Sequence, residues 1–173
     1  MDIHLRPARP GDGALMLEVA RASVEGLTGS HYDAEQIAAW TRDRTPAYYE
    51  PDIATGRTII AEKAGRAVGF VSSVPGELTR LFITPEVAGQ GLGARLVRFG
   101  IALACAETSR PVILQATLNA RRFYERNGFV YQSDGAYAHG TGGMPVRIVN
   151  MILAPSHYPA ERRSVSQIME AFA

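Results

Sequence analysis

The sequence has little of what a disulfide-stabilised, metal-binding or membrane-spanning protein needs. Its single cysteine, Cys105, can form neither an intrachain disulfide nor a cysteine-based metal site. No apolar run approaches the roughly 18–20 residues of a membrane span. The N-terminus has no apolar core of signal-peptide length. We therefore expect a cytoplasmic protein that contacts no membrane, and because no residues have metal-ligand spacing we expect no metal.

An excess of one charge is also missing. Eighteen Lys and Arg residues face 17 Asp and Glu, for a net charge of +1. This balance argues against a nucleic-acid partner held by a broad basic surface, although a local pocket for one phosphorylated ligand stays open. With 173 residues, 46% of them hydrophobic, the chain can bury its own core. We expect one domain over residues 1–155 and a tail, weakly helical, over 156–173.

The spacing of apolar residues predicts an α/β domain. Antiparallel strands come first and strand–helix–strand units follow, which is typical of a mixed sheet with helices. Asp12 and Asp33 are candidate helix caps, and Gly26 is a candidate helix stop. Residues 43–56 stay ambiguous because two prolines interrupt them. Strands are expected over 3–7, 58–62, 67–74, 77–83, 111–114, 129–137 and 146–153, and helices over 14–24, 33–40, 92–103, 119–126 and 160–173.

The most informative segment is the glycine-rich turn Gly89-Gln90-Gly91-Leu92-Gly93, where a strand leads into a helix. Glycines let a backbone approach a ligand closely, and a helix N-terminus adds free N–H groups with partial positive charge. The turn therefore predicts a phosphate site. It lacks the lysine and hydroxyl of a nucleotide P-loop and the spacing of a dinucleotide fingerprint. A loop that only joins strand to helix is the alternative, but three glycines there cost helix stability.

Two segments together resemble the GCN5-related N-acetyltransferase (GNAT) family. Residues 81–96, a strand followed by proline, Gly-x-Gly-x-Gly and an apolar helix, are similar to the family's coenzyme A signature. Residues 119–129, which end in Phe-Tyr-Glu-x-x-Gly-Phe, are similar to its second signature. Residues 32–40 are similar to a bacterial subgroup with diverse substrates. Ala88 departs from the family, which usually has Arg or Gln there.

The resemblance implies a bent, mostly antiparallel mixed sheet flanked by helices. The parallel strands before and after the glycine helix are expected to splay around acetyl-CoA, the implied cosubstrate. The implied reaction moves an acetyl group directly to a primary amine of a small molecule or peptide, and a homodimer through residues 160–173 stays open. The coenzyme-binding residues implied by the resemblance are Leu81, Phe82, Ile83, Gly89, Gln90, Gly91, Leu92, Gly93, Ala94, Asn119 and Tyr124.

The resemblance also suggests catalytic roles. Tyr124 is the candidate general acid for the leaving thiolate, with a packed aromatic beside Phe123 as the alternative. Glu77 is the candidate general base, directly or through a water, with an exposed strand-end carboxylate as the alternative. A backbone N–H near Phe82 or Ile83 is expected to polarise the acetyl oxygen. An acyltransferase is the leading interpretation, and a non-catalytic coenzyme A sensor or assembly module of the same fold is the alternative.

The acceptor side is less specified, because only the helices over residues 25–50 are expected to cover it. The candidate substrate-binding residues are His31, Tyr32, Tyr48 and Tyr49. Trp40 is assigned to the core, and Cys105 is expected to be a small buried hydrophobe. Asn119 is assigned both as a helix cap and as a coenzyme contact. His139, beside the glycine-rich loop 140–143, is a surface histidine or part of a lid.

Overall fold

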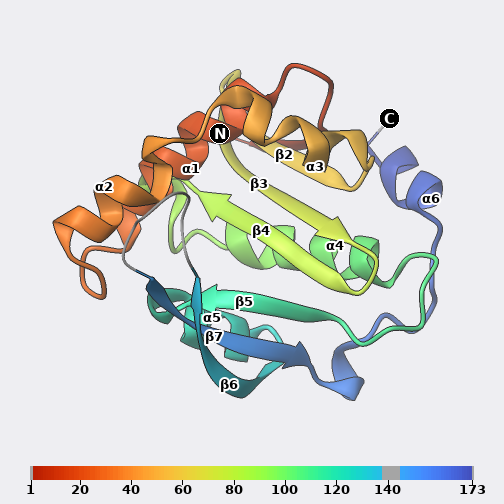
Figure 1. Cartoon of the computed structure of the whole chain (residues 1–173). Helices are drawn as coiled ribbons and strands as arrows, with labels where there is room; N and C mark the ends of the chain where they lie inside the picture. Colours follow the sequence, from red (N-terminus) through yellow and green to blue (C-terminus); the bar gives the residue numbers. More distant parts are fainter. Residues whose placement is uncertain (1, 138–144, 173) are drawn as a thin grey trace.

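The computed structural model describes residues 2–137 and 145–172 and confirms the mixed α/β fold (Figure 1). Seven strands form one sheet in the order β1-β2-β3-β4-β5-β7-β6. The strands are β1 (Ile3–Pro7), β2 (Thr58–Lys63), β3 (Arg66–Val74), β4 (Glu77–Ile83), β5 (Ile113–Thr117), β6 (Phe129–Tyr137) and β7 (Val146–Leu153). The α-helices are α1 (Gly13–Leu27), α2 (Ala34–Arg42), α3 (Glu50–Ala54), α4 (Leu92–Cys105), α5 (Arg121–Arg126) and α6 (Val165–Glu170).

The centre of the sheet contains its one parallel contact, between β4 and β5. The two strands pair only at Glu77 and Ile113, whereas every other neighbouring pair is antiparallel over five or more residues. From that point β4 and β5 diverge toward their carboxyl ends, as Figure 1 shows. The expected splayed pair is therefore present, and it leaves one edge of β4 without a neighbouring strand.

Helices cover both faces of the sheet. The consecutive residues Ile59 and Ile60 of β2 belong to two different buried clusters, as expected when successive side chains point to opposite faces. One cluster holds α4, whose Gly100 allows close packing, since a Cβ there would lie 2.7 Å from Val71. The other holds α1 and Tyr49. The sheet therefore has a core on each side.

The sequence predicts one of three helix ends fully, one in part and one incorrectly. Asp33 forms the capping box of α2 with Gln36, as expected for a cap. Asp12 makes no cap hydrogen bond, because its carboxylate accepts from Arg6, which lowers the pKa of Asp12. Gly26 does not end α1. A Cβ on Gly26 would lie 2.3 Å from Pro85, so this glycine permits close packing instead.

The C-terminal part packs against its own domain. Phe172 contacts Phe99 of α4 with ring centroids 4.9 Å apart, and Ile168 of α6 is buried in the main core. The homodimer stays a prediction. Cys105 is buried, as expected. His139 and loop 140–143 lie outside the described residues. Within 2–137 and 145–172, no helix is long and apolar enough to cross a membrane.

Candidate active site

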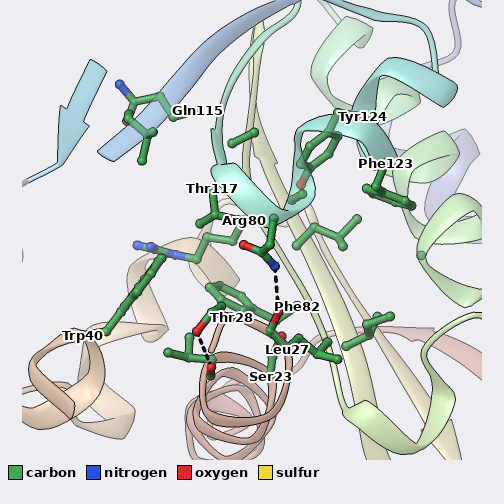
Figure 2. A pocket seen from close by; sticks show the side chains of 18 of the residues that line it. Ser23, Leu27, Thr28, Trp40, Arg80, Phe82, Gln115, Thr117, Phe123 and Tyr124 are labelled. Carbon is green, nitrogen blue, oxygen red and sulfur yellow. Dashed lines mark hydrogen bonds between the residues drawn. The ribbon is translucent and has the colours of Figure 1, made fainter. Parts of the chain in front are cut away.

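A cavity of about 520 Å³ lies where β4 and β5 diverge. Its walls come from α1, β4, β5 and the segment that leads into α5. Figure 2 shows Tyr124 and Phe123 on one side of this space and Trp40 on the other, with the guanidinium of Arg80 pointing toward Trp40. We call these two sides the donor end and the acceptor end. Gly93, Phe123 and Tyr124 define the former, and Trp40 and Arg80 define the latter.

The glycine turn places main-chain N–H groups beside the donor end. Gly91 precedes α4 with a φ of +85°, a left-handed conformation that favours glycine, and a Cβ there would meet nothing within 4 Å. The first bond of the helix runs from Arg95 N to Gly91 O (3.2 Å), so the preceding amides have no partner within the helix. Leu92, the first residue of α4, is only 1% exposed and packs into the core.

Two neighbours of Gly91 differ in what they can offer. Gly93 lines the cavity, and a Cβ there would lie 3.1 Å from the Phe123 ring, so glycine lets α5 approach α4. The side chain of Gln90 donates to Glu86 O (2.7 Å). The backbone N–H of Gln90 also bonds within the turn, to Val87 O (3.4 Å), so both donors of this residue are used there.

The free edge of β4 adds further donors and acceptors. Just after β4, Thr84 N donates to Val68 O of β3 (2.9 Å). Every second residue back along β4, including Phe82, therefore directs its N–H toward β3 as well. In an antiparallel pair the intervening residues face the other way. The N–H groups of Leu81 and Ile83 therefore face the gap toward β5, and both residues line the cavity.

Asn119 has a different place from the one expected of a helix cap. It lies in a turn before α5, whose N-cap is Ala120. Its Nδ2 donates to Leu27 O (3.1 Å), and its Oδ1 is buried without a hydrogen-bond partner. Buried polar atoms are usually satisfied, so this oxygen at the cavity wall indicates a ligand donor.

These donor-end groups fit coenzyme A. Its phosphates suit the free amides at the start of α4, and the amides of its pantetheine arm suit both the β4 edge and the orphaned Asn119 oxygen. Tyr124 lines the same end, is 6% exposed, and has its pKa raised by burial. Its hydroxyl therefore stays protonated at neutral pH and can donate a hydrogen bond.

Glu77 is not brought to the cavity. It lies where β4 and β5 are paired, opposite Ile113, at the closed end of the diverging strands. The cavity wall includes the rest of β4, from Leu78 to Ile83, but not Glu77. This position does not favour its assignment as the base.

Of the acceptor-side candidates, His31 reaches the cavity wall and Tyr32 does not. His31 Nδ1 lies 2.7 Å from Ser30 Oγ. The Tyr32 hydroxyl donates to Arg147 O (2.7 Å) and accepts from Leu118 N (2.9 Å). Tyr32 thus ties the start of α2 to β7 and to the turn that follows β5. Its hydroxyl serves the fold, which corrects its assignment to the substrate.

The adjacent tyrosines 48 and 49 also separate. Tyr49 is fully buried and stacks edge-on against Phe70, so it belongs to the core, which corrects its assignment as a substrate contact. Tyr48 is 36% exposed, and the guanidinium carbons of Arg44 and Arg80 lie 4.9 and 4.8 Å from its ring centroid. Burial alone would raise the pKa of Tyr48, but the two guanidinium groups lower it.

Several residues that line the cavity were not predicted from the sequence, chiefly Arg44, Arg80 and Tyr137. Arg80 is aimed by a bulge in β4, because Ser72 opposes Arg80 and Ser73 opposes Leu78, leaving Thr79 as an extra residue. A charged residue in the middle of a strand was a usable signal for Arg80. Trp40 is buried and also lines the cavity.

Comparisons with known proteins agree with this geometry. Residues 28–150 match the family model described as an acetyltransferase (GNAT) domain. The uncharacterized N-acetyltransferase YafP of Escherichia coli (strain K12) is 25% identical over 128 residues, 74% of this chain and 81% of that protein.

Solved structures resemble the whole fold. A GCN5-related N-acetyltransferase from Rhodopseudomonas palustris superposes with a TM-score of 0.79 at 27% identity, covering 89% of this chain and 96% of that one. The PaiA N-acetyltransferase of Thermoplasma acidophilum, in complex with coenzyme A, has a TM-score of 0.71 at 20% identity, covering 89% and 100%. At that identity the second likeness concerns the fold alone.

Proposed function

Because the chain belongs to the GNAT acetyltransferase family, we propose that it moves an acetyl group directly from acetyl-CoA to a primary amine of a small molecule or peptide. The observation that carries the proposal is the cavity between the diverging strands, with coenzyme-binding groups at one end and room for an acceptor at the other. Holding both reactants in one space makes their reaction effectively intramolecular, which is a large source of rate.

Main-chain donors support the acetyl-transfer step. As the amine attacks, negative charge develops on the acetyl oxygen and needs a donor fixed in advance. The N–H groups of Leu81 and Ile83 face the gap, whereas that of Phe82 bonds toward β3. We therefore assign the oxygen to the Leu81 or Ile83 amide.

Tyr124 supports departure of the thiolate. Burial keeps its phenol protonated, so the hydroxyl can donate to the sulfur as the carbon–sulfur bond breaks. No hydrogen bond of this hydroxyl is found among the described residues, which leaves the donor available.

His31 is the candidate base that replaces Glu77 in this account. Imidazole is the side chain that most often takes protons in catalysis near neutral pH, and His31 lines the cavity. When Ser30 Oγ accepts from Nδ1, Nε2 is left to accept the proton of the amine. His31→Gln is expected to lower kcat/KM about 100-fold, because the general base is lost. His4→Gln, exposed on β1, is the control. A kcat/KM of His31→Gln equal to that of the wild type would reject this base.

The test of the function is free-thiol release from acetyl-CoA across a panel of amines: amino acids, polyamines, aminoglycosides and short peptides. Release with at least one class, accompanied by the acetylated amine in the mass spectrum, is the expected result. Coenzyme A binding without release by any amine would contradict catalysis and favour a coenzyme A sensor of the same fold.

A further inference from the structure

The acceptor end of the cavity is cationic. Arg44 and Arg80 both line it, and no Asp or Glu is among its described lining residues. Both guanidinium groups lie within 5 Å of the Tyr48 ring centroid, one from the segment after α2 and the other from β4. Two arginines gathered at one end of a cavity favour a ligand with negative charge there.

Arg80 is fixed in place rather than left to move in solvent. Its Nε donates to Asp52 Oδ2 (2.5 Å) and its Nη1 to the Tyr48 hydroxyl (3.4 Å). The side chains of Arg80 and Asp52 are only 21% and 17% exposed, so the pair is held in a partly dry environment. A guanidinium oriented in this way loses little freedom when it binds an anion.

The fixed guanidinium keeps unused donor capacity. Within residues 2–137 and 145–172, nothing accepts a hydrogen bond from its Nη2, and Nη1 has only the long contact to Tyr48. A guanidinium offers five N–H donors in a planar fork that matches a carboxylate or a phosphate. Asp52 occupies one edge of this fork through Nε, and Nη2 and the second N–H of Nη1 remain for a ligand.

We propose that the acetylated amine also carries an anionic group, a carboxylate or a phosphonate-like group, that binds Arg80 and Arg44 at the acceptor end. The inference rests on the proposed function and narrows its substrate class to amino acid-like acceptors. The anion is placed at the Arg80 guanidinium, which points toward Trp40 in Figure 2. The amine of the same molecule then points to the donor end, where Tyr124 lies.

The test compares matched acceptors on the wild type and Arg80→Gln. Each acceptor is an amino acid paired with its carboxamide, so that only the anion changes. Loss of a charge-assisted contact costs about 10–100-fold in affinity. The wild type is expected to prefer the acid by about that factor in kcat/KM, mainly through KM. In Arg80→Gln this ratio is expected to fall toward one, and in Arg80→Lys to lie between, because lysine keeps the charge without the fork.

A purely structural role for Arg80 would affect acid and amide equally, so the ratio separates the two explanations. Arg6→Gln is the matched control: Arg6 is also partly buried and paired with carboxylates, at 2.6 Å from Asp12 and 2.8 Å from Glu62, but it does not line the cavity. Its ratio is expected to equal that of the wild type. If Arg80→Gln does not fold, the acid-to-amide ratios of kcat/KM for the wild type and for Arg80→Lys still test the inference.

The inference is overturned if the wild type acetylates acid and amide equally, or if Arg80→Gln keeps the full wild-type ratio. Aminophosphonates are tested as a second set of acceptors. If they are preferred and amino acids are not, the site binds a tetrahedral anion rather than a carboxylate. Turnover of neutral amines only would leave the proposed function standing and reject this inference. If no amine reacts, the proposed function fails. The anion site is then tested by calorimetry, which compares the affinities of the N-acetylated acid and the N-acetylated amide for the coenzyme A-loaded protein. Equal affinities would reject the anion site.

Discussion

The donor end of the cavity offers a ligand mainly main-chain groups, whereas the acceptor end offers mainly side chains. At the former, glycine keeps the start of α4 open and the β4 edge lacks a neighbouring strand. At the latter, Arg80 comes from β4, whereas Trp40 and Arg44 come from α2 and the residues that follow it. A backbone site depends on a few glycines and a strand break and tolerates changes elsewhere. A side-chain site changes when any of the side chains that form it is substituted.

The largest expected effect tests the hydroxyl at the donor end. Tyr124→Phe removes the hydroxyl that we propose as donor to the leaving thiolate, and it should lower kcat by about 10²–10⁴ with little change in coenzyme A affinity. Steady-state kinetics and calorimetry measure the two quantities. The matched control is Tyr158→Phe, whose hydroxyl accepts from Val112 N (2.9 Å) away from the cavity. A near-normal kcat in Tyr124→Phe would make this residue only a packed aromatic.

The next effect tests whether main-chain groups hold the phosphates. Gly91→Asp places a carboxylate beside the free amides of α4, and we expect about 100-fold weaker coenzyme A binding, about 3 kcal/mol, by calorimetry. Gly56→Asp is the control, because Gly56 also has a positive φ (+68°) and open space around a Cβ. It carries the same backbone strain without the ligand. Equal loss in both variants would remove the phosphate site from this turn.

The smallest effect compares the pH dependence of Tyr124 with that of Tyr48, which packs against Arg44 and Arg80 but does not line the cavity. Burial raises the pKa of Tyr124, so above about pH 10, the ordinary tyrosine value, the folded chain keeps a proton that the unfolded chain releases. The stability that this tyrosine contributes is therefore complete below pH 10 and is lost as pH rises further. Tyr124→Phe should lose stability between pH 10 and 11 less steeply, by up to about 1.4 kcal/mol per pH unit.

Tyr48 should show the opposite sign. Burial alone would raise its pKa, but Arg44 and Arg80 lower it, so the folded chain releases this proton before the unfolded chain does. Its contribution grows as pH rises toward 10, and Tyr48→Phe should lack that gain. Urea unfolding from pH 8 to 11 measures both variants. Parallel curves for the two would contradict this difference between the tyrosines.

The sequence predicted the fold and the donor end because both depend on local patterns. Strand alternation, the glycine turn and the Phe-Tyr-Glu helix each lie within a short segment. The acceptor end depends on long-range packing, which a single sequence does not display. Tyr48 and Tyr49 show why: they are neighbours in sequence, yet one is fully buried and the other is 36% exposed. Arg80 needed the β4 bulge to define its direction.

The measurement that tests the central claim most directly is the initial rate of thiol release over a grid of acetyl-CoA and acceptor concentrations. The account holds that both reactants occupy the two ends of one cavity at once and that transfer is direct. It predicts reciprocal plots that intersect, the pattern of a ternary complex. Parallel lines, the pattern of a covalent acetyl-enzyme that forms before the amine binds, would contradict it.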